Sequence, residues 1–373
     1  MNATPCECFN LTTLWTDCDD VFDNFKEPEY FSYRYRTVGT LFQGIVFIVG
    51  VLGNAMVVLV VSKVMALHSP TNYYLVSLAI ADTVVLLASV PQEVLSYYLV
   101  GNQWIWGNVG CSLMIYCQNL GINASSLSLV TLTVERYIAI CHPMKAHKIC
   151  TIGRAKKITV GMWVFAIFYC SPWLFLTETV PVNYRGYPEI HQCIFKRPRE
   201  EYLVGFFLDL VLFYVIPLIL SCILYTLIIR SLNERGKVTV KGAPKGSVAL
   251  EAVNTHSKSQ VVKMLAVVVA VFAVLWLPYR GLLVYNSFMT LFGKSPFMDL
   301  WYLMFAKTCV YINSAINPFL YNAMSTKFRR AFHRMLVCKR ATRPPVITIS
   351  TVAGPSLSSA SSSHRETTTV SVV

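Results

Sequence analysis

Charged side chains are scarce in this sequence of 373 residues. Asp, Glu, Lys and Arg make up only 14% of it, whereas 55% of its residues are hydrophobic. A water-soluble domain of that composition would aggregate, so we expect a lipid bilayer to be the solvent. The short alternating segments of a membrane β-barrel are also missing, which excludes that architecture.

The sequence lacks the marks of several other protein classes. None of its seven histidines has a partner at catalytic or metal-ligand spacing, so we do not expect an enzyme. No internal repeat points to a secondary transporter. No apolar core precedes Pro28, and we therefore expect no cleavable signal peptide.

Long apolar runs are what the sequence does contain. A membrane-spanning helix needs roughly 20 mostly apolar residues, and the runs of that length are 39–62, 73–99, 107–134, 158–176, 202–229, 262–287 and 300–322. Because unpaired backbone cannot face lipid, they predict one all-α bundle of seven transmembrane helices. The expected divisions are a tail at 1–37, a membrane domain at 38–323, a short amphipathic eighth helix at 324–338 and a disordered tail at 339–373.

The distribution of basic residues predicts the orientation. Of the 32 Lys and Arg, we assign 21 to the odd-numbered loops and the carboxyl-terminal tail, which places that tail in the cytosol. Glycosylation sequons at Asn2 and Asn10 support an outside amino terminus, whereas the sequon at Asn123 lies inside a span and should stay bare. Anionic inner-leaflet lipid explains the net charge of +13, so we expect no nucleic-acid partner.

Five cysteines fall on the predicted outer side, where disulfides persist. Cys111 opens the third run, and Cys193 is the only cysteine between the fourth and fifth runs, so we predict a bridge between them. Cys6, Cys8 and Cys18 remain in the amino-terminal tail; their pairing is undetermined, and one of them is left odd.

Short motifs recur in order along the seven runs. They are Gly53-Asn54, Leu78–Asp82, Cys111 with Glu135-Arg136-Tyr137, Trp163, Pro217 with Tyr225, Phe272 with Trp276-Leu277-Pro278, and Asn317–Tyr321. Together they resemble the rhodopsin-like (class A) G-protein-coupled receptors, over about 38–338. The resemblance implies a receptor of the plasma membrane whose partners include a heterotrimeric G protein, receptor kinases and arrestin.

Longer stretches resemble the thyrotropin-releasing hormone receptors within that family. Among them are Gly121–Ser126, Arg154–Lys157 and Lys263–Val269. This likeness implies a short amidated neuropeptide as ligand and signalling through the Gq class, phospholipase C and calcium. Two positions depart from it, because those receptors usually have tyrosine where this chain has Asn119 and arginine where it has Lys307. Lysine cannot reproduce the planar fork of arginine.

The resemblance also implies which residues carry activation. Arg136 would pair with Glu135 at rest and face the G protein when released, while Pro278 and Pro318 can kink their helices. Trp276 and Phe272 match the packing switch of the family, although isolated aromatics are often core filler. The whole set is Glu135, Arg136, Tyr137, Tyr225, Phe272, Trp276, Pro278, Asn317, Pro318 and Tyr321.

An acid in the middle of the second run needs a partner or water. Asp82 could be surrounded by oxygens from Ser125, Asn313 and Ser314, and oxygen ligands suit a hard cation. The resemblance implies an allosteric sodium site, with no other metal or cofactor expected. The alternative is a neutral, hydrogen-bonded acid.

Polar side chains gather in the outer halves of runs three, six and seven. The candidate ligand-binding residues are Gln118, Asn119, Asn123, Tyr279, Arg280, Asn286, Lys307 and Tyr311. Buried polar groups need partners, so these residues bind either a polar ligand or one another. The cations Arg280 and Lys307 favour a ligand, although Asp209 and Glu93 are possible partners for them.

The carboxyl-terminal part carries further expectations. Ser325–Leu336 has the pattern of a basic amphipathic helix on the inner leaflet, and Cys338 beyond it is a candidate palmitoylation site. The Ser- and Thr-rich tail should be disordered and open to phosphorylation. Its end, Ser371–Val373, matches a PDZ-domain ligand or occurs there by chance. We also expect 231–258 to be a mobile loop.

Two other receptor types remain as alternatives. An opsin-type light receptor needs a lysine seven residues before the proline that matches Pro318, but Tyr311 stands there and Lys307 lies one turn away. A class A receptor for an unrelated ligand would keep the same scaffold.

Overall fold

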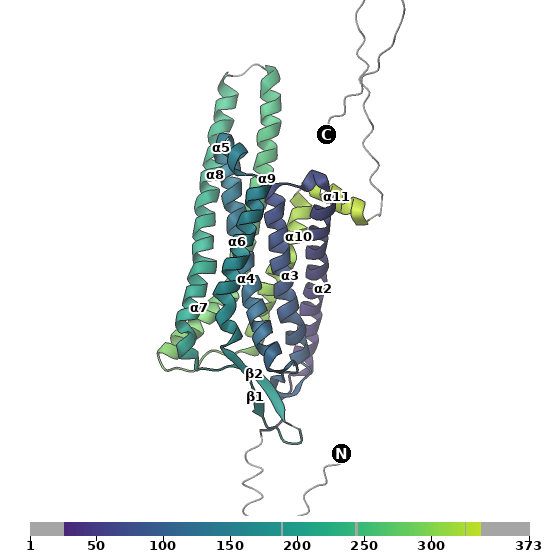
Figure 1. Ribbon diagram of the computed structural model, residues 1–373, viewed down its shortest axis with the longest axis vertical. Coiled ribbons are helices and arrows are strands. Elements are labelled where there is room, and N and C mark those ends of the chain that lie inside the picture. Colours follow the sequence, from purple (N-terminus) through teal and green to yellow (C-terminus); the bar gives the residue numbers. More distant parts are fainter. Residues whose placement is uncertain (1–25, 188, 243–244, 325, 337–373) are drawn as a thin grey trace, which may run out of the picture.

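Seven helical rods lie side by side in the computed structural model, which describes residues 26–187, 189–242, 245–324 and 326–336 (Figure 1). The rods are α2 (Tyr33–Lys63), α3 (Pro70–Ser96), α4 (Gly107–Cys141), α6 (Ile152–Cys170), α7 (Leu203–Leu210) continued by α8 (Ile216–Gly242), α9 (Lys245–Leu291) and α10 (Leu300–Met324). The predicted seven-helix bundle is confirmed.

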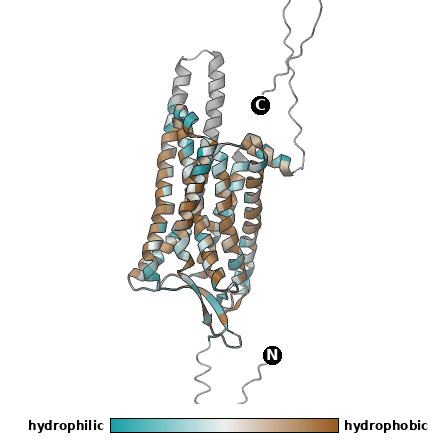
Figure 2. Cartoon of the chain, viewed as in Figure 1, coloured by the Kyte–Doolittle hydropathy of each residue, from teal (hydrophilic) through white to brown (hydrophobic). Residues whose placement is uncertain are grey.

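Six stretches within the described residues are long and apolar enough to cross a membrane: Tyr33–Lys63, Pro70–Ser96, Gly107–Cys141, Ile152–Leu174, Arg199–Glu234 and Ala266–Leu291. The seventh rod, α10, has 25 residues but carries Lys307, Asn313 and Asn317 along its length. These polar residues make it less apolar than the others. Figure 2 shows hydrophobic residues along the rods and hydrophilic residues towards both ends.

Shorter elements mark the two ends of the bundle (Figure 1). One end, here the α11 end, carries η1 (Met65–Leu67), α5 (Pro143–Ile149) and α11 (Thr326–Leu336). The other, the hairpin end, carries η2 (Val100–Asn102), η3 (Ser171–Leu174), β1 (Thr177–Val182), β2 (Ile190–Phe195) and η4 (Arg199–Tyr202). The two strands pair antiparallel, with Thr177 opposite Phe195.

Local chemistry explains where the rods begin and bend. Ser69 and Thr151 accept hydrogen bonds from the first turns of α3 and α6, as N-cap residues do. Pro217 cannot donate a backbone hydrogen bond, and the turn just before it, Val211–Val215, is π-helical. Pro278 and Pro318 lie inside α9 and α10, as predicted.

Several predicted boundaries were wrong. Helix α2 begins at Tyr33, inside the segment predicted as tail, because Ser32 caps it. Helix α4 contains Glu135-Arg136-Tyr137, as the sequence indicated, but it continues beyond the apolar run 107–134 to Cys141, because helix formation does not require apolar residues. Most of 231–258, predicted as a loop, is helical in α8 and α9.

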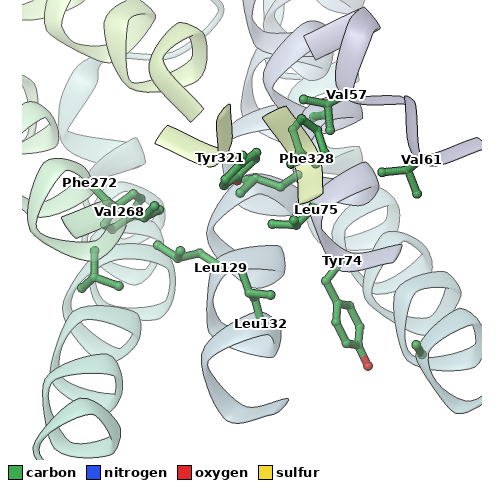
Figure 3. Close-up of a cluster of buried hydrophobic side chains, with 14 of the residues drawn as sticks. Val57, Val61, Tyr74, Leu75, Leu129, Leu132, Val268, Phe272, Tyr321 and Phe328 are labelled. Atoms are coloured by element: carbon green, nitrogen blue, oxygen red, sulfur yellow. The ribbon is translucent and has the colours of Figure 1, made fainter. Parts of the chain in front are cut away.

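The largest buried hydrophobic cluster lies towards the α11 end (Figure 3). Val57, Leu75, Leu132 and Phe272 contribute to it from four different rods. Phe328 of α11 joins it, with its ring 6.3 Å from that of Tyr321. The predicted eighth helix is therefore present and packs its apolar face against the bundle.

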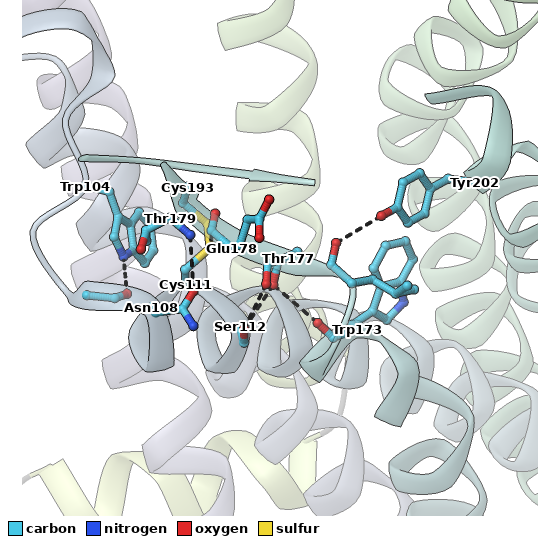
Figure 4. The surroundings of a disulfide bond; sticks show 12 residues. Trp104, Asn108, Cys111, Ser112, Trp173, Thr177, Glu178, Thr179, Cys193 and Tyr202 are labelled. Atoms are coloured by element: carbon cyan, nitrogen blue, oxygen red, sulfur yellow. Dashed lines mark hydrogen bonds between the residues drawn. A yellow bond between two sulfur atoms is a disulfide. The ribbon is translucent and has the colours of Figure 1, made fainter. Parts of the chain in front are cut away.

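A disulfide fixes the hairpin to α4 (Figure 4). It joins Cys111 and Cys193, which confirms the predicted pair. Beside it, the Thr177 hydroxyl lies 3.1 Å from that of Ser112, and the backbone N–H of Thr179 donates to Asn108 Oδ1 at 3.1 Å. The hairpin therefore has covalent and hydrogen-bonded attachments to one helix end.

Several predicted sites fall outside the described residues. They are Asn2, Asn10, Cys6, Cys8, Cys18, Cys338 and Ser371–Val373, and they remain predictions.

Gly50 offers a test of how closely α2 packs. A Cβ at Gly50 would meet the Cβ of Ala315 in α10 at 2.8 Å, whereas one at Gly44 would meet nothing within 4 Å. Overpacking a tight contact typically costs about 1–3 kcal/mol. We expect Gly50→Val to lower the melting temperature of the purified protein by several degrees. Gly44→Val on the same helix is the matched control, and an equal effect of both would contradict this packing.

Candidate functional site

A cavity of about 310 Å³ opens among the rods towards the hairpin end. Its walls come from α3, α4, α7, α9 and α10, with contributions from η3 and β2. Six of the eight predicted ligand-binding residues line it: Gln118, Asn119, Tyr279, Arg280, Lys307 and Tyr311. Helices far apart in the sequence thus bring the predicted polar set to one place.

The other two predicted residues make contacts of a different kind. Asn123 is fully buried and donates from Nδ2 to Asp209 Oδ1 at 3.0 Å. Asn286 binds the backbone of Phe297 in both directions, at 3.0 and 2.7 Å, and lines a separate cavity of about 190 Å³. It therefore holds the connection between α9 and α10.

Arg280 forms a buried ion pair at the cavity wall. Its Nη1 lies 2.9 Å from Asp209 Oδ2, and both residues are less than a tenth exposed. The guanidinium also lies over the ring of Trp276, 5.0 Å from its centre. This stacked arrangement connects a charge at the cavity to the ring predicted as the packing switch.

Lys307 forms a second ion pair, which joins α10 to α3. Its Nζ lies 2.6 Å from Glu93 Oε2 in α3. The Tyr97 hydroxyl lies 3.5 Å from the other oxygen of Glu93 and donates to Gln43 Oε1 at 2.9 Å. Gln43 in turn donates to the Thr308 hydroxyl at 3.2 Å, so the network joins α2, α3 and α10.

These pairs bear on the argument from free cations. The sequence favoured a ligand for Arg280 and Lys307 and offered Asp209 and Glu93 as possible partners, and the structure pairs the cations with these two acids. The acids lie on other helices, so helical spacing could not join them to their cations. The four charges of the cavity compensate one another.

Asp82 lies deep in the bundle, fully buried. The Ser125 hydroxyl donates to Asp82 Oδ1 at 3.0 Å, and Asn317 Nδ2 donates to Oδ2 at 2.8 Å. Ser314 and Asn313 are buried on the adjoining stretch of α10. The carboxylate and hydroxyl oxygens are ligands that suit a hard cation such as sodium, whereas Asn317 presents its amide nitrogen to Asp82. Asn317 was predicted for activation, and its contact with Asp82 was missed.

A wider polar neighbourhood fixes the helices around this acid. Asn54 Nδ2 donates to the backbone oxygens of Gly50, at 3.0 Å, and Ser314, at 2.9 Å.

In the described part of the chain no three His, Cys, Asp or Glu gather as they would around a transition metal.

Among the residues predicted for activation, Trp276 lines the cavity, whereas Glu135, Arg136 and Tyr137 lie near the α11 end. Arg136 Nη2 is 3.8 Å from Glu135 Oε1, to which the Thr71 hydroxyl donates at 3.3 Å. The Tyr137 hydroxyl is 3.3 Å from His142 Nε2. Tyr225 and Tyr321 are both buried. The predicted resting pair of Glu135 and Arg136 is present.

Aromatic rings join the cavity to the interior. The ring centres of Trp276 and Phe272 are 6.0 Å apart, and those of Phe272 and Tyr214 are 5.9 Å apart. The Tyr214 hydroxyl donates to the backbone of Ala273 at 3.0 Å. Trp276 and Phe272 are therefore in one packed line below Arg280.

One wall of the cavity was not anticipated. Trp173, Phe195 and Phe206 line it from η3, β2 and α7. No sequence pattern links three aromatic residues spread over three segments, because their proximity depends on how the hairpin is attached. Such contacts require the tertiary structure.

Comparison with known proteins gives a consistent result. The family profile described as 7 transmembrane receptor (rhodopsin family) matches residues 53–321. The chain is 44% identical to the thyrotropin-releasing hormone receptor of Homo sapiens over 326 residues, which are 82% of this chain and 80% of that receptor. The corresponding Gallus gallus receptor is 42% identical over 339 residues, covering 86% and 84%. Neuromedin-U receptor 2 of Mus musculus is 33% identical over 306 residues, covering 78% and 73%.

The Lys307–Glu93 pair can be tested by a double-mutant cycle. The two side chains are 29% and 17% exposed, so removing one partner should cost less than the roughly 3–5 kcal/mol of a fully buried pair, although the remaining charge is still left uncompensated. We expect Lys307→Gln and Glu93→Gln each to lower the melting temperature of the purified protein more than the double variant does.

The exposed pair of Glu27 and Arg185 supplies the control. Because a surface pair contributes only about 0–1 kcal/mol, Glu27→Gln should change the melting temperature little. Additive losses from Lys307→Gln and Glu93→Gln would show that the two residues do not depend on each other.

Proposed function

Since this chain belongs to the rhodopsin family of seven-transmembrane receptors, we propose that it is a cell-surface receptor for a short, amidated neuropeptide. Its family identifies it as a multi-pass membrane receptor and not an enzyme. The observation that carries the proposal is the cavity at the hairpin end, where polar side chains from separate helices converge. The named ligand of its relatives, a releasing hormone, supports a peptide.

The cavity suits a peptide for chemical reasons. Pockets of roughly 300–1,000 Å³ hold small ligands, with a few polar groups that fix their orientation. Gln118, Tyr279, Arg280 and Lys307 can donate hydrogen bonds to the carbonyl oxygens of a peptide or of a terminal amide. The carboxylates of Asp209 and Glu93 can accept hydrogen bonds from its N–H groups.

Arg280 would pass the signal inward. A ligand that moves it changes both the pair with Asp209 and the contact with Trp276. Pro278 gives α9 a hinge next to these residues. An agonist must bind the active arrangement better than the resting one, because equal affinity for both would shift nothing.

The α11 end would face the cytosol. The basic loops predict this orientation, and the pair of Arg136 and Glu135 lies at that end. Release of Arg136 would expose it to a G protein, for which we propose the Gq class with phospholipase C and calcium downstream. Arrestin, receptor kinases and a PDZ protein at Ser371–Val373 are the further partners we propose.

Sodium is the proposed allosteric ligand. Asp82, Ser125, Asn313 and Ser314 would hold it, and the ion would compensate the buried carboxylate.

The opsin alternative has less support. Lys307 lies one turn from the position that a retinal lysine takes, and Tyr311 occupies that position. An unrelated ligand of a class A receptor is the other outcome that a ligand screen would reveal.

The proposed function can be tested by screening short amidated peptides, with their free-acid forms, on cells that express the chain. We expect amidated members to release calcium. Arg280→Ala should lower their potency by about tenfold or more, since a charged hydrogen bond is lost, without an equal loss of surface receptor. Unchanged potency in both Arg280→Ala and Lys307→Ala would contradict this binding site.

The sodium proposal predicts an ion-specific effect. Agonist affinity on membranes should fall when sodium replaces an organic cation of equal ionic strength, because the ion stabilises the resting state. Asp82→Asn removes the charge that the ion needs and should abolish the difference. Equal sodium dependence in the original chain and in Asp82→Asn would refute the site.

A further inference from the structure

The cavity has two chemically different walls. Its polar part consists of the ion pairs of Arg280 with Asp209 and of Lys307 with Glu93. Its aromatic part consists of the rings of Trp173, Phe195 and Phe206, the last of which is one turn before Asp209 on α7. The polar wall offers a ligand charges and hydrogen-bonding groups, and the aromatic wall offers it apolar surface.

Most charged groups of the polar wall already have partners, although Arg280 Nε has none among the residues that the structure describes. Asp209 accepts hydrogen bonds from Arg280 and Asn123, and Glu93 accepts one from Lys307. Asn119 turns its amide back onto the Ile115 carbonyl of its own helix, at 2.8 Å. A ligand that binds these groups must replace bonds that exist, so the net gain from each exchange is small.

The aromatic wall has no such competition. Trp173 stacks on Phe206 with ring centres 5.9 Å apart, and Phe195 lies 5.8 Å from Trp173. The three rings remain partly accessible and line the cavity. Apolar surface that faces a water-filled cavity gains free energy when a ligand covers it, at about 25 cal/mol per Å².

The charge beside these rings decides what kind of group fits. The guanidinium of Arg199 lies over the Phe206 ring, 5.8 Å from its centre. A cationic ligand group would meet that positive charge, whereas an uncharged ring can pack edge-on or offset against its neighbours.

The wall is also held in place before any ligand arrives. Phe195 follows Cys193 by two residues in β2, and the disulfide to Cys111 fixes that strand on α4. Trp173 accepts a hydrogen bond at its backbone oxygen from Thr177 at the start of the hairpin (Figure 4). A rigid wall binds a ring at a low entropic cost.

We propose that Trp173, Phe195 and Phe206 form a subsite for an uncharged aromatic side chain of the ligand. The inference deepens the proposed function and rests on it, since it specifies one residue of the proposed peptide. The ligand would place this ring against the aromatic wall while its backbone and amide groups face the ion pairs.

The subsite can be tested without signalling. The probes are N-acetyl-tryptophanamide and N-acetyl-alaninamide, added at equal concentration to the purified full-length receptor, with melting followed by loss of the monomer peak on size-exclusion chromatography. A ligand that binds the folded state raises its melting temperature. We expect the tryptophan probe to give roughly twice the shift of the alanine probe or more.

Variants locate the effect. Trp173→Ala should remove most of the excess shift, and Trp173→Phe should restore it. Phe195→Ala serves as the second variant if Trp173→Ala does not fold. Phe168→Ala is the matched control, because that ring is 72% exposed on α6 and does not line the cavity. Equal shifts from both probes, or an excess that survives in Trp173→Ala and in Phe195→Ala, would overturn the subsite.

A cell-based arm separates the two proposals. Among amidated peptides, an aromatic residue should raise calcium potency about tenfold over alanine at the same position, and Phe195→Ala should reduce that preference. If no peptide acts but the tryptophan probe still stabilises the receptor through Trp173, the peptide function fails and the aromatic subsite stands.

Discussion

Polar side chains inside an apolar bundle must find partners on other helices, because lipid offers none. This constraint fixes how the rods of this receptor are rotated against one another. Asp82 of α3 takes hydrogen bonds from Ser125 of α4 and Asn317 of α10. Nearer the hairpin end, Asp209 joins Asn123 of α4 to Arg280 of α9. Each of these hydrogen bonds forms only when the two helices are rotated about their axes so that the two side chains face each other. The network therefore sets the shape of the cavity above Asp82.

The same constraint gives the cavity its response to a ligand. Arg280 cannot leave Asp209 without a substitute for the pair, since a lone buried charge is costly. It also cannot move without changing its contact with Trp276, whose ring is followed by Phe272 in the interior. A ligand group that replaces the contact of Arg280 with Asp209 or with Trp276 therefore changes how α9 is held. Lys307 of α10 is held in a similar way by its ion pair with Glu93, next to which Tyr97 donates a hydrogen bond to Gln43.

Sequence patterns predicted the features that depend on residues close together in the sequence. They missed many of the contacts between residues that are far apart in the sequence. Length and hydropathy located all seven rods, and the offsets around Pro278 identified the aromatic pair below it. Helix ends were less accurate, because Ser32 acts through one hydrogen bond and α4 continues past its apolar run. The ion pairs could only be suggested, since Glu93 and Lys307 are brought together by packing. The aromatic wall gave no signal at all, because it depends on where a disulfide places the hairpin.

Helix α4 runs past each of the functional sites of the molecule, from the hairpin to the α11 end. Along its 35 residues it carries the hairpin disulfide at Cys111, the cavity residue Gln118, the contact to Asp82 at Ser125, and Arg136. It contains no proline, whereas α9 and α10 each contain one. An intact hydrogen-bond ladder resists bending, and a proline interrupts it. Phe195 of the aromatic wall is fixed to α4 through the hairpin disulfide, so it belongs to the rigid side of the cavity. Arg280 and Lys307 lie on helices that a proline interrupts, so a ligand that contacts them and Phe195 connects the fixed part of the receptor to parts that can bend.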